Sequence, residues 1–284
     1  MTVKAPDIDV VAALVREVAY DVVLPRFRRL GPADILAKAT ATDREDVVTV
    51  ADHEAERRLT DALTALLPGS LVLGEESCHV DPSLLSMLDG EAPVWVVDPV
   101  DGTRNFVAGL DGFGVMVAYV ERGTTRAAWL VLPARDEHYA AERGGGCFRN
   151  GVRVQVPAVD AHEPPRGTLH ARYMPKVLSG LASVAAAGHH REASDERASI
   201  VEYTEVVKGH REFLVYYRLN PWDHVAPALI LQEAGGFVEH LNGRAYDVRS
   251  TDQVTIVAAD RTTADTVRGW FPANPLPMPA EPRA

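Results

Sequence analysis

An acidic turn at the end of an apolar segment most constrains how this chain can fold. Residues 94–97, Val-Trp-Val-Val, predict a buried strand, and residues 98–106 continue as Asp-Pro-Val-Asp-Gly-Thr-Arg-Asn-Phe. A strand that ends at Asp98 delivers its carboxylate to one fixed point, and the locked φ of Pro99 stiffens the exit. Asp101 can reach the same side of the turn. Two converging carboxylates repel unless a proton or a divalent cation lies between them, so the segment indicates a metal site.

The residues after Asp101 suit a phosphate group. Gly102 permits a close backbone approach or a positive φ, and Thr103 is a good residue for the beginning of a helix. Free N–H groups at a helix start attract phosphate. The alternative is an ordinary Asp-rich turn that caps a helix, and this segment alone leaves both interpretations open.

Further acids follow or precede predicted elements. Residues 71–73, Leu-Val-Leu, predict a second strand that ends at adjacent acids, Glu75 and Glu76. Only one of the two can point into a pocket if the chain stays extended, because neighbouring side chains alternate faces, and we take Glu75. Asp46 precedes a helical apolar pattern, and Asp223 stands at the start of another. Taken singly, each acid is more typical of a helix cap or a solvated charge.

Taken in order, these blocks resemble the inositol monophosphatase family of lithium-sensitive, magnesium-dependent phosphatases. That family has an acid in its first loop, here Asp46, and a Gly-Glu-Glu strand end, here residues 74–76. An Asp-Pro-hydrophobic-Asp-Gly-Thr turn stands at residues 98–103, and Trp-Asp followed by Gly-Gly spans residues 222–236. The resemblance covers residues 10–260.

The resemblance implies an α+β fold, a layered α-β-α-β-α sandwich of the inositol monophosphatase and fructose-1,6-bisphosphatase type. We expect residues 1–154 to form an N-terminal α+β half with an antiparallel sheet and most metal ligands. Residues 155–271 would form a smaller α/β half that carries substrate contacts and Asp223, with one of its strands at residues 183–187. Residues 272–284 hold five prolines and are predicted to be a disordered tail.

The resemblance also implies two or three Mg²⁺ ions per chain. Glu75, Asp98 and the backbone carbonyl of Val100 would bind one ion, and Asp98, Asp101 and Asp223 the second. A third, weaker ion would share Glu75. The family relation implies inhibition by lithium as well.

The implied reaction is hydrolysis of a phosphate monoester by in-line attack of a metal-activated water. Thr103, hydrogen-bonded toward Asp46, would orient this water and help to deprotonate it. The backbone N–H groups of Gly102 and Thr103 would hold phosphate oxygens. The chain has neither a Gly-x-Ser-x-Gly elbow nor a Walker A pattern, which disfavours a serine hydrolase and a nucleoside triphosphatase.

The substrate half departs from the family at Arg218. Inositol-specific enzymes have a glutamate after the aromatic pair, where this chain has Tyr216-Tyr217 followed by arginine. An arginine facing the pocket would suit a second anionic group, whereas the alternative is a surface arginine. Inositol monophosphate is the reference substrate. Fructose 1,6-bisphosphate, histidinol phosphate and 3′-phosphoadenosine nucleotides remain alternatives, as does a regulatory binding partner with little catalysis.

Composition agrees with an enzyme that acts on a small phosphorylated metabolite. The 40 acidic residues outnumber the 29 Lys and Arg residues, and a net charge of −11 disfavours a nucleic-acid surface. No apolar run approaches the ~18 residues of a membrane span, and the N-terminus lacks an apolar signal core. We expect a cytoplasmic protein without a membrane partner, and a homodimer because the family is commonly dimeric.

Overall fold

The computed structural model describes most of the chain, namely residues 6–37, 47–171, 174–194, 196–217, 219–249 and 254–272. Two predicted site residues, Asp46 and Arg218, lie outside the described residues. Residues 273–284 of the predicted tail lie outside them as well. Within the described part of the chain, no helix is long and apolar enough to cross a membrane.

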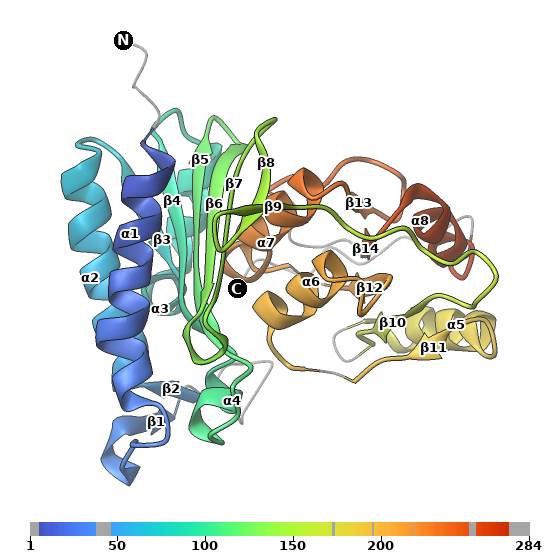
Figure 1. Cartoon of the computed structure of the whole chain (residues 1–284), viewed down its shortest axis with the longest axis horizontal. Coiled ribbons are helices and arrows are strands. Elements are labelled where there is room, and N and C mark those ends of the chain that lie inside the picture. Colours follow the sequence, from blue (N-terminus) through green and yellow to red (C-terminus); the bar gives the residue numbers. More distant parts are fainter. Residues whose placement is uncertain are drawn as a thin grey trace.

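The elements form five layers in the order α-β-α-β-α (Figure 1). Two long helices cover the outer face of a seven-stranded sheet, two helices fill the middle, and a five-stranded sheet and two further helices complete the stack. The layered α+β sandwich that the sequence predicts is confirmed. The layer helices are α1 (Ile8–Val18), α2 (Val50–Leu66), α6 (Ser199–Val207), α7 (Pro221–Glu233), α5 (Lys176–Ala186) and α8 (Arg261–Arg268).

The seven strands of the large sheet are hydrogen-bonded in chain order. The first pair is parallel and every later pair is antiparallel. The strands are β3 (Leu71–Gly74), β4 (Val94–Asp101), β5 (Gly114–Glu121), β6 (Thr124–Leu132), β7 (Glu137–Glu142), β8 (Gly146–Arg149) and β9 (Val152–Val154). Short helices α3 (Glu75–Val80) and α4 (Thr103–Val107) follow β3 and β4.

The small sheet has the strand order β11-β10-β12-β14-β13 and mixes parallel and antiparallel pairs. The strands are β10 (Arg166–Leu169), β11 (Arg191–Glu192), β12 (Phe213–Tyr216), β13 (Phe237–His240) and β14 (Thr255–Ala258). A separate hairpin pairs β1 (Ile35–Ala37) with β2 (Val47–Thr49). The boundary that we predict after residue 154 falls between β9 and β10.

The prediction of a strand at residues 183–187 is wrong, because residues 183–186 are the end of α5 and Ala187 is its C-cap. Leu178, Ala182 and Ala186 are buried at a spacing of four residues, which is the period of a helix face. A short apolar run is ambiguous between strand and helix when it is read alone. Packing of that face against the small sheet decides in favour of the helix.

Strand β4 is buried on both faces, which explains its continuous apolar sequence. Trp95 and Val97 pack toward α1 and α2, whereas Val94 and Val96 belong to the core between the sheets. Asp98 has the parity of Val94 and Val96, so it points into the same middle layer. The alternation of β4 therefore directs the first acid of the turn toward α6 and α7.

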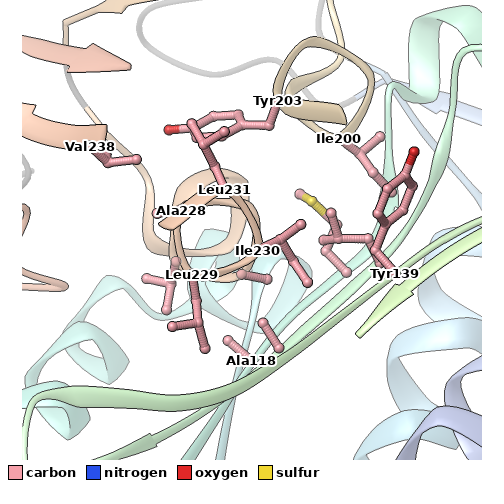
Figure 2. Close-up of a cluster of buried hydrophobic side chains, with 14 of the residues drawn as sticks. Ala118, Tyr139, Ile200, Tyr203, Ala228, Leu229, Ile230, Leu231 and Val238 are labelled. Carbon is pink, nitrogen blue, oxygen red and sulfur yellow. The ribbon is translucent and has the colours of Figure 1, made fainter. Parts of the chain in front are cut away.

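Helix α7 is the centre of the middle layer. Figure 2 shows Leu229 and Ile230 of α7 beside Ala118 of the large sheet, with Val238 of the small sheet on another side of the helix. Because α7 packs on both sheets, it is apolar around most of its circumference. The same helix carries Asp223 in its first turn.

We expect Ile230→Ala to lower the free energy of unfolding by about 2–5 kcal/mol, because the side chain is fully buried and its loss leaves a cavity. Val184→Ala on the outer face of α5, where the side chain is 78% exposed, should change it by less than about 0.5 kcal/mol. Urea denaturation of both variants measures the difference. Equal effects would contradict the placement of α7 in the core.

Candidate active site

A β-bulge brings Asp98 and Asp101 to one face of β4. Residues three apart on a regular strand point to opposite faces. Asp98 pairs with Met116 and Asp101 with Gly114, so β4 uses three steps where β5 uses two. The extra residue resets the alternation, as bulges do, and both carboxylates face the middle layer.

The third acid comes from the second half of the chain. Asp223 lies in the first turn of α7, and Asn220 Nδ2 donates to its Oδ2 at 3.0 Å. On the neighbouring helix, Ser199 Oγ donates to the backbone oxygen of Asp223 at 2.7 Å. Ligand oxygens of Asp98, Asp101 and Asp223 all lie within 4.8 Å of one another. The structure therefore brings together three of the predicted metal ligands.

Burial makes Asp101, one acid of this cluster, hard to ionise without a cation. Asp101 accepts a hydrogen bond from the backbone N–H of Ile200 at 2.6 Å. Burial raises the pKa of Asp101 to about 7, although the hydrogen bond from Ile200 lowers it, and the charge of Glu75 adds to the rise. Three carboxylates in so small a space have the chemistry of a divalent-cation site, since hard cations prefer oxygen ligands.

Glu75 begins α3 and is not one of the three clustered acids. Its charge raises the pKa of both Asp52 and Asp101, which places Glu75 near the two of them. The argument from an extended chain that separated Glu75 from Glu76 does not apply, because the helix begins at Glu75 itself. The role of Glu75 as a ligand stays a prediction.

Glu56 of α2 holds the start of α3. Its carboxylate accepts hydrogen bonds from Glu76 N at 2.8 Å, from Ser77 N at 2.9 Å and from Ser77 Oγ. Gly74 is required here, because a Cβ at this position would lie 2.3 Å from Glu56 Cδ. Sequence reasoning missed Glu56. This buried carboxylate binds the backbone N–H groups of Glu76 and Ser77 and so fixes the position of the preceding residue, Glu75.

Thr103 is anchored by Asp52. Thr103 Oγ1 lies 2.9 Å from the carbonyl oxygen of Val100 and 3.2 Å from Asp52 Oδ1. A hydroxyl has one proton, so it donates to only one of these acceptors at a time. The predicted partner, Asp46, lies outside the described residues, and the carboxylate that the structure places beside Thr103 is Asp52.

Asp52 also serves as the N3 residue of α2. Its Oδ2 accepts from Thr49 N at 2.8 Å and from Thr49 Oγ1 at 2.6 Å, while Thr49 Oγ1 accepts from Ala51 N. This reciprocal cap fixes the carboxylate, and burial raises its pKa to about 6. The Thr-x-x-acid spacing before an apolar helical pattern was the sequence signal that could have identified Asp52.

Gly102 joins the acidic turn to α4. It adopts φ +80°, and a Cβ would lie 2.6 Å from the carbonyl oxygen of Gly112. The left-handed conformation and this close approach both require glycine. Gly102 and Thr103 thus occupy the start of a short helix beside the three acids, where we predict that their N–H groups contact phosphate.

Comparison with known proteins identifies the family. The model of the inositol monophosphatase family matches residues 5–269. The chain belongs to the inositol monophosphatase family. Membership makes the protein a phosphomonoesterase, and this family is generally metal-dependent, in agreement with the acidic cluster.

Relatives within the family carry different names. A Thermotoga maritima protein named fructose-1,6-bisphosphatase/inositol-1-monophosphatase is 31% identical over 216 residues, which cover 75% of this chain and 78% of that protein. A histidinol-phosphatase of Chlorobaculum parvum is 32% identical over 216 residues, which cover 71% and 75% of the two chains. The solved structure of a Thermotoga maritima IMPase aligns with a TM-score of 0.73 at 26% identity, covering 92% and 96%.

We expect Glu56→Gln to weaken divalent-metal binding by about ten- to hundredfold. The NH2 group of the glutamine amide cannot accept the hydrogen bonds that the backbone N–H groups of α3 donate to the carboxylate, so the start of α3 and Glu75 would be held less firmly. Isothermal titration with Mg²⁺ measures the change. Glu54→Gln is the matched control, since Glu54 lies on the same helix and pairs with Arg57 and Arg58 of that helix. Unchanged metal affinity in Glu56→Gln would contradict a positioning role.

Metal affinity should rise as the pH rises through about 7. A cation binds the ionised form of Asp101, whose folded pKa of about 7 lies above its ordinary value of 3.8, so binding at lower pH must displace a proton. The raised pKa also means that the metal-free fold loses stability as the pH rises from about 4 to 7.

Titration calorimetry in two buffers of different ionisation enthalpy tests this pH dependence. About one proton should be released per cation at pH 6 and much less at pH 8. Asp101→Asn, which keeps the size of the side chain, should remove that release. Proton release that is equal at both pH values would refute the assignment.

Proposed function

We propose that the protein is a Mg²⁺-dependent phosphomonoesterase that hydrolyses a small phosphorylated metabolite, with inositol monophosphate as the reference substrate. The observation that carries this proposal is the convergence of Asp98, Asp101 and Asp223 within 4.8 Å in a chain of a phosphatase family. Two of the acids lie on β4 and the third lies on α7, more than a hundred residues later in the sequence, which a set of helix caps would not require.

The proposed metal ligands follow the geometry and the family. Asp98, Asp101 and Asp223 would hold one Mg²⁺, and Glu75, Asp98 and the carbonyl of Val100 a second. A third, weaker ion would share Glu75. Bound Mg²⁺ supplies charge that offsets the developing charge on the phosphoryl and leaving oxygens and lowers the pKa of a coordinated water.

The residues around the ions would position water and phosphate. Thr103 would hold the attacking water through its hydroxyl, and Asp52 would accept the proton of that hydroxyl at the 3.2 Å contact. The same role for Asp46 stays a prediction, because Asp46 lies outside the described residues. The N–H groups of Gly102 and Thr103 would bind phosphate oxygens at the beginning of α4.

Phosphate release from a panel of substrates tests the function. The panel holds inositol 1-phosphate, fructose 1,6-bisphosphate, histidinol phosphate and 3′-phosphoadenosine 5′-phosphate. Relatives bear three of the corresponding activities in their names, fructose-1,6-bisphosphatase, inositol-1-monophosphatase and histidinol-phosphatase. Negligible phosphate release from every substrate would favour the alternative of a regulatory binding partner. We also propose that the protein is a homodimer, which size-exclusion chromatography tests.

We expect Asp98→Asn to abolish turnover, because it removes a carboxylate shared by both proposed ions. Thr103→Ala should lower kcat by about 10²–10⁴-fold with little change in Mg²⁺ affinity, because its hydroxyl would position water rather than bind metal. Asp61→Asn, at an exposed position on α2, is the control. Loss of metal binding in Thr103→Ala as large as in Asp98→Asn would overturn the role of Thr103.

A further inference from the structure

One side-chain amide joins the two halves of the chain beside the acidic turn. Asn105 lies in α4, the short helix that follows the turn, and its side chain is half-buried. Its Nδ2 donates a hydrogen bond to the carbonyl oxygen of Gly112 at 2.7 Å and another to the carbonyl oxygen of Glu196 at 2.8 Å. Gly112 precedes β5 of the large sheet, whereas Glu196 precedes α6 in the second half. Asn105 therefore connects the turn to the entrance of a helix in the other half.

These two contacts require the amide group of Asn105. A carbonyl oxygen has no proton, so only a donor can approach two of them at these distances, and an NH2 group has two protons to donate. Both protons of the Asn105 amide are thus used. An aspartate here would bring further acceptors toward the two carbonyl oxygens, and a leucine, which has nearly the same shape, would donate nothing. The contacts therefore select asparagine among side chains of this size.

Both segments that Asn105 holds lie against Gly102 of the acidic turn. A Cβ on Gly102 would lie 2.6 Å from the carbonyl oxygen of Gly112 and 2.9 Å from the Cβ of Ala198. Ala198 follows Glu196 by two residues and is buried. The turn thus touches the segment before β5 and the segment before α6, and Asn105 binds the same two segments from its place in α4.

The segment after Glu196 contacts two of the three clustered acids. Ser199 Oγ donates to the backbone oxygen of Asp223 at 2.7 Å, and Ile200 N donates to Asp101 Oδ2 at 2.6 Å. Asp101 ends β4 and Asp223 lies in α7, so the start of α6 contacts one acid from each half of the chain. The separation of these two acids therefore depends on where the start of α6 lies.

The backbone ahead of α6 has a conformation that its contacts must impose. Arg197 has φ +53°, in the left-handed region that residues other than glycine rarely adopt. Such a conformation persists only where the surrounding structure holds it. The carbonyl of Glu196 belongs to the planar peptide group that precedes Arg197, so the bond from Asn105 fixes the plane from which this φ is set. Without that bond, the segment could relax and shift the start of α6.

We propose that Asn105 is a positioning residue for the metal site, which holds the start of α6 against the acidic turn and so fixes the separation of Asp101 and Asp223. The inference rests on the metal site of the proposed function and adds a residue that acts through the backbone it binds. Ser199 and Ile200 transmit this position to the two acids.

Mg²⁺ affinity measured by isothermal titration calorimetry tests this role. In Asn105→Leu, the Kd for Mg²⁺ should rise about tenfold, because loss of a group that orients metal ligands weakens metal binding. Asn105→Ser keeps a hydroxyl with one proton, which can serve one carbonyl oxygen at most, so its Kd should rise by a smaller factor. A role confined to stability would lower the unfolding temperature and leave the Kd of the folded protein unchanged.

Asn150→Leu is the matched control. Asn150 also donates through Nδ2 to a backbone carbonyl, that of Asp136 at 3.0 Å, but this bond stays within the first half of the chain. The variant should unfold at a lower temperature and bind Mg²⁺ as the wild type does. Titrations of all variants at one temperature below every unfolding midpoint separate a loss of stability from a loss of positioning.

The outcomes separate this inference from the proposed function. An unchanged Kd in folded Asn105→Leu, or an equal rise in Asn150→Leu, overturns the role of Asn105. If Asn105→Leu does not fold, an unchanged Kd in Asn105→Ser overturns it, and failure of both variants to fold assigns Asn105 to stability alone and overturns it too. Phosphate release by the wild type is measured in parallel, and its absence overturns the proposed function while the Kd values still decide the role of Asn105. A wild type that binds no Mg²⁺ overturns both proposals.

Discussion

The convergence of three carboxylates, two of them buried and one half-buried, is the constraint around which this structure is arranged. Oxygens of Asp98, Asp101 and Asp223 lie within 4.8 Å of one another. No chain would hold them there without rigid support, because like charges in a poorly solvated space oppose ionisation. The support comes from the β4–β5 bulge and from backbone donors such as Ile200 N. Burial is the main reason that the pKa of Asp101 is raised, and a bound cation would favour its ionised form.

The middle layer serves as both core and site. Helices α6 and α7 pack between the two sheets through apolar side chains, and their first turns carry the groups that meet the acidic turn of β4. Displacing either helix would therefore disturb folding and metal binding together. The outer helices α5 and α8 cover only the small sheet, so their packing is less directly connected to the acids.

Positioning residues were harder to predict than the acids that they position. Glu56 reads as an ordinary helix residue in the sequence, and the Thr-x-x-acid spacing marks Asp52 as a helix cap alone. Nothing local shows that Glu56 holds α3 or that Asp52 approaches Thr103. Their roles arise from contacts between α2 and the ends of β3 and β4. The segment 183–187 failed for a related reason, because its helical state depends on the surface that it covers.

The sequence by itself determined the apolar strands that lead to the acids, the glycine turn at residue 102 and the order of motifs that resembles the family, whereas β4 runs on past Asp98 to Asp101. These features follow from local patterns of apolar, acidic and turn residues. Only the tertiary structure decided that Asp98, Asp101 and Asp223 meet, that Asp52 holds Thr103, and that Glu75 starts a helix. The physical reason is that these contacts depend on a bulge and on packing between distant layers, which no local pattern encodes.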